Sequence, residues 1–128
     1  MSNLMAVGVL TVDDQQIFRR TLASLIEAAP GFDQVGEASS GTEALELVAE
    51  LRPDLVLLDV RMPGMDGIET ARRLAGADSR PVVILISIDE MPDAETALAA
   101  TSAVACVRKQ DLSTRKLHEL WAALARQD

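Results

Sequence analysis

The chain has 128 residues, of which 48% are apolar but only 2% aromatic, and its formal net charge is −8. This length fits one domain with its own core, which must be aliphatic because aromatic side chains are so few. The negative charge repels phosphate backbones, so we expect no direct binding to nucleic acid. The single cysteine cannot form an internal disulfide, which favours a reducing compartment. Without a basic leader or an apolar run of membrane-spanning length, we expect a soluble, cytoplasmic protein.

Five apolar runs alternate with five segments of helical periodicity along the chain. The runs are short and bounded by turn residues, and they predict strands at residues 6–12, 34–38, 55–58, 81–86 and 103–107. Apolar residues spaced three or four apart predict a helix after each run. The predicted helices are marked by Phe18, Leu22, Leu25, Ile26 and Ala29; by Ala44, Leu47, Val48 and Leu51; by Ile68, Ala71 and Leu74; by the segment 92–100; and by Leu117, Leu120, Trp121 and Leu124.

Several helix boundaries carry capping signals. Ser40 followed by Glu43 matches the capping box, in which the glutamate side chain reaches back to the amide of Ser40. Pro92 suits the first turn of the fourth helix, and Ser113 can cap the last helix. These signals predict where the second, fourth and fifth helices begin.

The alternation predicts a single doubly wound α/β domain over residues 1–128, with its core at about 6–126. Right-handed crossovers and the chain length favour a flavodoxin-like five-stranded parallel sheet of order 2-1-3-4-5, with five helices. In that order the first, third, fourth and fifth strands are consecutive neighbours. Polar residues follow each of these strands, namely Asp13, Asp14, Asp59, Ser87 and Lys109. We therefore expect these side chains to converge on one site.

Asp59 stands at the end of the third predicted strand, whose unbroken apolar run at 55–58 indicates burial on both faces. In open α/β sheets, ligands bind outside the carboxyl ends of the strands. The next helix begins only near Gly67, after a turn rich in proline and glycine, so Asp59 is too far away to cap it. Its position favours a role in chemistry.

Three carboxylates at one sheet edge repel one another, by about 3 kcal/mol per pair at about 5 Å and an effective dielectric constant of about 20. A divalent cation would relieve this repulsion, and an all-oxygen site with few protein ligands suits Mg²⁺. Lys109 could pair with a phosphate bound to that metal, and Ser87 could donate a hydrogen bond to it. An aspartate can attack a phosphoryl group and form an aspartyl-phosphate. The residues thus predict phosphoryl transfer to an aspartate.

Four motifs occur here in a specific order and spacing. They are Val12-Asp13-Asp14, the sequence LLDVRMPGMDG at 57–67, Ser87 after the fourth predicted strand and Lys109 after the fifth. In this combination the chain resembles the receiver domain of two-component response regulators over essentially its whole length. Its sequence is most similar to those of receivers that precede a helix-turn-helix output domain.

The resemblance implies a role for each of these residues. Asp59 would accept a phosphoryl group from a histidine kinase or phosphotransfer protein and so switch a partner or output domain. The Mg²⁺ site would consist of the carboxylates of Asp13, Asp14 and Asp59 and the backbone carbonyl of Arg61. Ser87 and Lys109 would bind the phosphoryl oxygens. Such a domain is a signalling module that assists its own phosphorylation and dephosphorylation, and not an enzyme in the usual sense.

Two positions depart from the family pattern. Gln110 follows Lys109 where many receivers have proline, so we expect a trans peptide bond there. Cys106 replaces the usual aromatic residue three positions before Lys109, which removes the ring that normally reports the signal. We interpret this cysteine as a small buried apolar residue and not as a redox sensor. Arg61 and Asp89, each two residues beyond a site residue, could form a salt bridge over the site.

Other classes of protein fit less well. A haloacid-dehalogenase-type phosphatase needs a second aspartate two residues after the nucleophile, where this chain has Arg61. The segment 36–42 imitates a phosphate-binding loop but lacks its lysine, and no dinucleotide-binding glycine pattern is present. The alternative that stays open is that the chain is the receiver portion of a DNA-binding transcription regulator whose output domain is absent from it.

Overall fold

The structure is a computed structural model, and it describes residues 6–88 and 103–124. These residues form five strands, four α-helices and one short 3-10 helix. In chain order the elements are β1 Val7–Val12, α1 Gln16–Ala28, β2 Phe32–Ala38, α2 Gly41–Leu51, β3 Leu55–Asp59, α3 Gly67–Leu74, β4 Val82–Ser87, β5 Ala103–Arg108, η1 Lys109–Asp111 and α5 Thr114–Leu124. The helix predicted at 92–100 lies outside the described residues.

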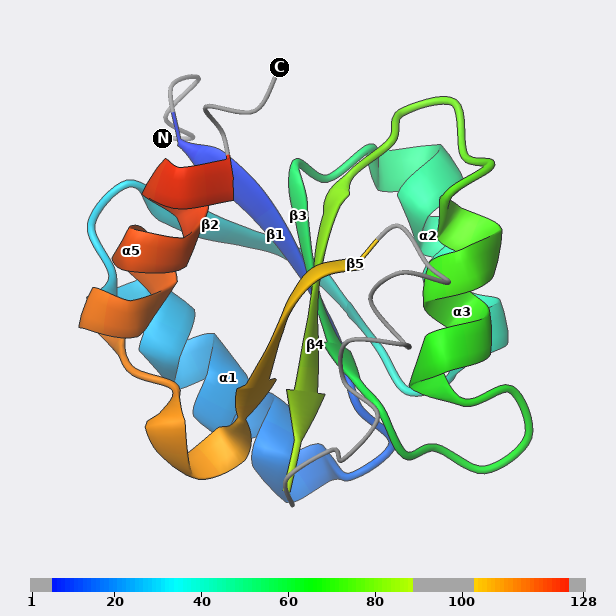
Figure 1. Ribbon diagram of the computed structural model, residues 1–128, viewed down its shortest axis with the longest axis horizontal. Helices are drawn as coiled ribbons and strands as arrows, with labels where there is room; N and C mark the ends of the chain where they lie inside the picture. Colours follow the sequence, from blue (N-terminus) through cyan, green and yellow to red (C-terminus); the bar gives the residue numbers. More distant parts are fainter. Residues whose placement is uncertain (1–5, 89–102, 125–128) are drawn as a thin grey trace.

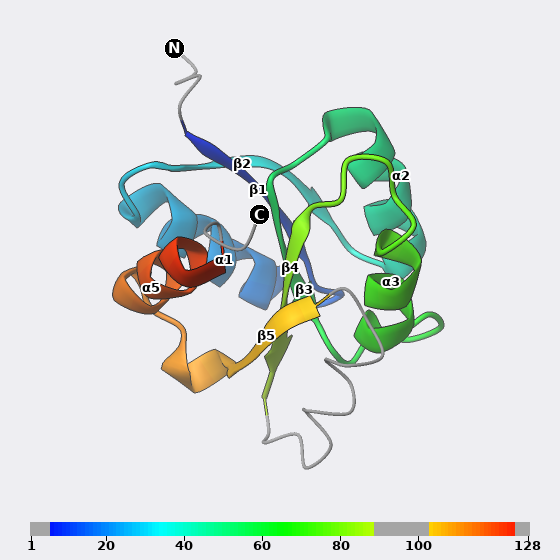
Figure 2. The ribbon, with the colours of Figure 1, turned by 45° about the horizontal axis from the view of Figure 1, so that its top comes forward.

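The strands form one parallel sheet of order β2-β1-β3-β4-β5, which confirms the predicted doubly wound topology. Figure 1 shows α1 and α5 on one face of this sheet and α2 and α3 on the other. Figure 2, turned by 45°, shows the same two layers of helices. No helix in the described part of the chain combines the length and apolarity that crossing a bilayer requires.

The core is split by the sheet into two aliphatic layers. In β3, Leu55 and Leu57 pack with residues of α1 and α5, whereas Val56 and Leu58 pack with residues of α2 and α3. All four side chains are fully buried, as the unbroken apolar run predicts for a strand covered on both sides. The alternation of side chains along a strand explains why such a run serves two layers at once.

Two details of α2 differ from the sequence prediction. Glu43 does close a capping motif, but its carboxylate accepts from the amide of Ser39 at 2.6 Å and not from that of Ser40. The backbone of Ser40 is extended, and its hydroxyl accepts from the Glu43 amide as predicted. The Glu43 carboxylate instead bonds the amide of the residue before Ser40. Leu51, predicted to point into the core, is 38% exposed because it lies at the end of α2 beside the edge strand, where it covers Gly36.

Candidate functional site

The register of the sheet brings the ends of the central strands together. Val12 is paired with Leu58, and Asp59 with Ile86, so Asp13, Asp59 and Ser87 stand at neighbouring positions on the carboxyl edge. Lys109 follows directly after β5, whose Arg108 is paired with Ser87. The convergence predicted from the strand order is therefore present in the structure.

Three carboxylates meet at this edge. Asp13, Asp14 and Asp59 each offer one oxygen, and these atoms all lie within 4.8 Å of one another. Asp13 is fully buried and Asp59 is 6% exposed, whereas Asp14 is exposed to solvent. Three hard oxygen donors this close together, with one side open to solvent, fit a small divalent cation that keeps part of its water shell, such as Mg²⁺.

The loop after β3 is folded tightly beneath Asp59. Gly67 opens α3, and a Cβ atom at this position would overlap the backbone carbonyl of Asp59. The Gly67 amide donates to the carbonyl of Val60 at 2.8 Å, which closes the loop. Asp66 accepts from the Glu69 amide at 2.9 Å and so caps α3, as expected for a helix that begins well after Asp59. The capping role thus belongs to Asp66, and the side chain of Asp59 is left to the site.

Lys109 supplies the positive charge of the site. Its Nζ donates to Asp13 Oδ2 at 3.1 Å, whereas Asp59 Oδ1 lies 3.9 Å away. The first distance is a hydrogen bond and the second is only an ion-pair contact. The lysine side chain is 12% exposed, so solvent screens these charges little. The ammonium of Lys109 therefore interacts more strongly with the carboxylate of Asp13 than with that of Asp59.

The electrostatic environment of Asp59 reflects this arrangement. Burial raises the pKa of its carboxyl group from 3.8 to about 6, and the charge of Asp13 acts in the same direction. Lys109 and a backbone hydrogen bond from Arg61 lower the pKa, but they do not offset the burial. The carboxylate is ionised above about pH 6, where it is a desolvated anion and hence a competent nucleophile.

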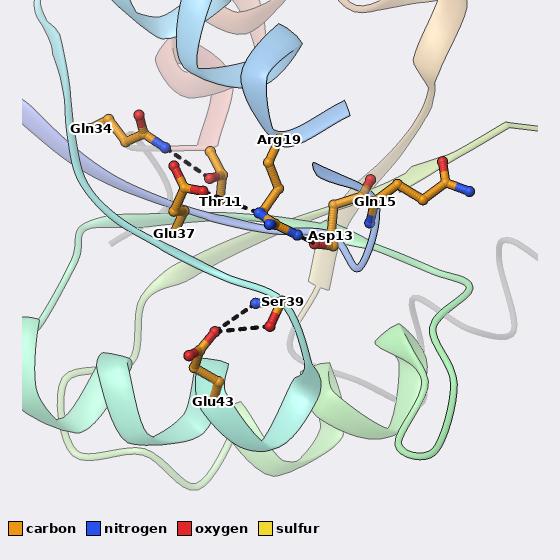
Figure 3. A network of polar contacts seen from close by, with 8 residues as sticks. All are labelled: Thr11, Asp13, Gln15, Arg19, Gln34, Glu37, Ser39 and Glu43. Atoms are coloured by element: carbon orange, nitrogen blue, oxygen red, sulfur yellow. Dashed lines mark hydrogen bonds and ion pairs between the residues drawn. The ribbon is translucent and has the colours of Figure 1, made fainter. Parts of the chain in front are cut away.

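Asp13 is fixed by several contacts, part of which Figure 3 shows. Its Oδ1 accepts from the amide of Gln15 at 2.8 Å, and its backbone carbonyl accepts from Arg19 at 2.7 Å. Arg19 also reaches Glu37 on β2 at 3.1 Å, so that its guanidinium links the end of β1 to the neighbouring strand. The Gln15 bond thus orients the carboxylate of Asp13, and the Arg19 bonds hold the backbone at the end of β1.

The family of the chain follows from this fold, this site and one comparison. A family model for the response regulator receiver domain matches residues 9–121. The chain belongs to this family. A receiver of two-component signalling is what the motifs predicted, and the matched range lies within the core expected at about 6–126.

Two curated relatives to which the chain is similar are longer proteins with different names. Protein-glutamate methylesterase/protein-glutamine glutaminase 5 of Myxococcus xanthus is 39% identical over 126 residues, which are 97% of this chain and 36% of the relative. Transcriptional regulatory protein LiaR of Bacillus subtilis is 41% identical over 81 residues, which are 63% of this chain and 38% of the relative. The chain thus spans little more than a third of either relative.

Solved receiver structures share the fold. The signal receiver domain of NarL from Mycobacterium tuberculosis has a TM-score of 0.84 and 31% identity, covering 96% of this chain and 98% of its own. The response regulator domain of CheB from Thermotoga maritima has a TM-score of 0.76 and 32% identity, covering 95% of both chains. The flavodoxin-like architecture predicted from the sequence is therefore that of known receivers.

The remaining predicted positions of this receiver fall as follows. Ser87 is buried at the end of β4, and Arg61 is exposed just beyond Asp59. The salt bridge predicted between Arg61 and Asp89 involves a residue outside the described ones. The described residues contain no cis peptide bond, so Lys109 and Gln110 are joined in trans as predicted.

Cys106 is half-buried against the core, and burial raises the pKa of its thiol, which agrees with an unreactive apolar role.

Sequence reasoning placed Phe18 only in the core and did not single out Arg19. The ring of Phe18 lies under the ammonium of Lys109, 3.8 Å from Nζ to the ring centroid. Strand alternation was a signal that could have found this contact. Side chains two positions apart along a strand point to the same face of the sheet. Leu57 and Val107 both face the α1 layer, so Asp59 and Lys109, each two residues later, are expected to face α1 as well.

Proposed function

We propose that this receiver accepts a phosphoryl group on Asp59 from the phosphohistidine of a histidine kinase or phosphotransfer protein. The observation that carries the proposal is the buried Asp59 carboxylate at the end of β3, with two further carboxylates within 4.8 Å and an ammonium at 3.9 Å. In this reaction an Asp59 oxygen forms the new bond to phosphorus. The bond from phosphorus to the donor nitrogen breaks, and its electron pair stays on the imidazole.

The residues around Asp59 would share the work of charge neutralisation. The carboxylates of Asp13, Asp14 and Asp59, with the backbone carbonyl of Arg61, would hold Mg²⁺, which supplies positive charge to the phosphoryl oxygens when bound. Ser87 would donate a hydrogen bond to one of those oxygens, and Lys109 would pair with another. Phosphoryl transfer needs positioned groups and positive charge more than it needs acid–base groups. The residues at this edge of the sheet would supply the positioning and the charge.

Intact-mass measurement after incubation with acetyl phosphate and Mg²⁺ tests this proposal. The wild-type chain should gain one phosphoryl group, and the gain should be lost in Asp59→Asn and when the metal is removed. Asp54→Asn is the matched control, because it neutralises an aspartate at the opposite end of the same strand and should leave the adduct intact. An adduct that persists in Asp59→Asn would assign the phosphoryl group to another residue.

The output of the switch is the second part of the proposal. Relatives named as methylesterases and as a transcriptional regulator both match this receiver, so phosphorylation would switch a linked or separate output module in the cytoplasm. We attribute no methylesterase activity to the chain, since the match covers 36% of that relative. The alternative of a DNA-binding regulator draws support from LiaR, which is named a transcriptional regulatory protein. The coding sequence after Asp128 would decide whether a helix-turn-helix domain follows.

A further inference from the structure

The ammonium of Lys109 is enclosed by two carboxylates and an aromatic ring. Asp13 takes its hydrogen bond at 3.1 Å, Asp59 lies 3.9 Å away, and the ring centroid of Phe18 lies 3.8 Å away. A cation within about 6 Å of a ring centroid is attracted to the negative face of the ring. The contact between Lys109 and Phe18 is well inside that limit.

The fold presents this ring to the site from α1. Phe18 stands four residues before Leu22, which is 1% exposed, so both side chains point toward the same face of the sheet. The ring offers no strong hydrogen-bond acceptor, and it keeps water away from one side of the ammonium. Since the lysine side chain is only 12% exposed, the ring accounts for part of this shielding. A cation–π contact is stronger when the cation is desolvated in this way.

We propose that Phe18 is a positioning residue for phosphoryl transfer, whose ring holds the Lys109 ammonium within reach of the phosphoryl group on Asp59. This inference rests on the function proposed above. In the structure Nζ is bonded to Asp13 and must move toward Asp59 to pair with a phosphoryl oxygen. The flat ring supports the ammonium in both places, because attraction to a ring face does not depend on one donor–acceptor line. Lys109 keeps its protons throughout, and only its ionic partner changes.

The first test observes the contact directly. The chain has two lysines, Lys109 and Lys116, so a protein labelled only in its lysine side chains gives two sets of Hε–Cε signals. We expect the Hε signals of Lys109 to be shifted upfield by the ring current of Phe18. Phe18→Leu should abolish this shift, whereas Phe32→Leu should preserve it, because the second phenylalanine contacts His118 instead. The wild-type spectrum alone overturns the proposal if both lysines have the shifts of free lysine.

The second test measures the rate of phosphorylation by acetyl phosphate at saturating Mg²⁺. Phe18→Leu should slow it by about threefold to thirtyfold, the span between weak and desolvated cation–π contacts. Phe18→Tyr, which keeps the ring face, should recover most of the rate, and Phe32→Leu should match the wild type. In a Lys109→Met background, Phe18→Leu should have no further effect, because the two residues act through one contact.

The outcomes separate this inference from the proposed function. A wild-type chain that takes up no phosphoryl group would overturn the proposed function and the role of Phe18 with it. A chain that is phosphorylated equally fast with and without the Phe18 ring would overturn the positioning role alone. If Phe18→Leu does not fold, Phe18→Met, which also removes the ring, takes its place in the rate measurement, and wild-type Hε signals without an upfield shift overturn the role in any case. A ring-current shift without any change in rate would also reject the role.

Discussion

Two aspartates at opposite ends of β3 show how far position in the sheet determines the chemistry of one residue type. Asp54 precedes the strand, is exposed, and accepts from the amide of Gly8 at 2.8 Å. Asp59 ends the strand and is 6% exposed, and burial raises the pKa of its carboxyl group to about 6. They lie five positions apart in the sequence, yet the first is a solvated hydrogen-bond acceptor and the second is a destabilised anion.

The difference comes from what surrounds each end of the parallel sheet. At the amino end, the side chain of Asp54 accepts from one backbone amide of β1 and is otherwise exposed to solvent. At the carboxyl end, Asp59 lies beside Asp13 and Lys109, the first residue of η1, and the loop after β3 folds back against its backbone carbonyl. A neighbouring carboxylate and the loss of water both disfavour the ionised form. The carboxyl edge thus stores electrostatic free energy that a bound cation can release.

The largest expected effect concerns Asp13, which is buried like Asp59 but has its own cation. Asp13→Asn should lower the free energy of unfolding of the metal-free protein by about 2–4 kcal/mol, because it leaves the ammonium of Lys109 without its closest partner. Denaturant melts at pH 8 in the presence of a chelator would measure this. A variant more stable than the wild type would show that repulsion among the carboxylates outweighs the ion pair.

The next effect has the opposite sign. Asp59→Asn should raise the metal-free free energy of unfolding by about 1–3 kcal/mol at pH 8, since a raised pKa means that ionisation of this group opposes folding. The folded state takes up a proton as the pH falls through about 6, and the unfolded state does so only near 3.8. The gain should therefore shrink to roughly half at pH 5 and nearly vanish by about pH 3.

Mg²⁺ provides the control for that prediction. Added metal should stabilise the wild type more than Asp59→Asn, because the variant has lost one charged ligand. Paired denaturant melts at several pH values, with and without Mg²⁺, would test both statements. A gain that stays constant from pH 8 to pH 4 would mean that the ionisation of Asp59 does not oppose folding.

A smaller effect is expected at the amino end of the same strand. Asp54→Ala should lower the free energy of unfolding by about 0.5–1.5 kcal/mol, because it removes the acceptor of one backbone amide. This loss should be the same with and without Mg²⁺, and the rate of phosphorylation should not change. A metal-dependent loss in Asp54→Ala would mean that the two ends of β3 are coupled.

The smallest change in stability is expected for Asp14. This side chain is exposed, so Asp14→Asn should raise the metal-free free energy of unfolding by no more than about 1 kcal/mol. It should nevertheless weaken Mg²⁺ binding, which calorimetric titration would measure. Unchanged affinity for Mg²⁺ would remove Asp14 from the proposed metal ligands.

The sequence by itself determined the strands, their order and the residues at their ends. Apolar runs and helical spacings are local patterns, and the short right-handed connections between them permit few topologies. That is why the sequence alone places Asp13, Asp59 and Lys109 at one edge of the sheet. The trans bond after Lys109 and the cap at Ser113 followed from equally local rules, and both are present.

Only the tertiary structure decided how these residues share their charges. The sequence predicted three carboxylates in mutual repulsion, but in the structure Lys109 is bonded to Asp13 and lies farther from Asp59. The tertiary structure also decided that Phe18 lies under that ammonium and that the carboxylate of Glu43 accepts a hydrogen bond from the amide of Ser39. Such contacts join side chains from separate elements, and differences of less than an ångström between them separate a hydrogen bond from a looser ion pair. Packing sets those distances, and no periodicity along the chain encodes them.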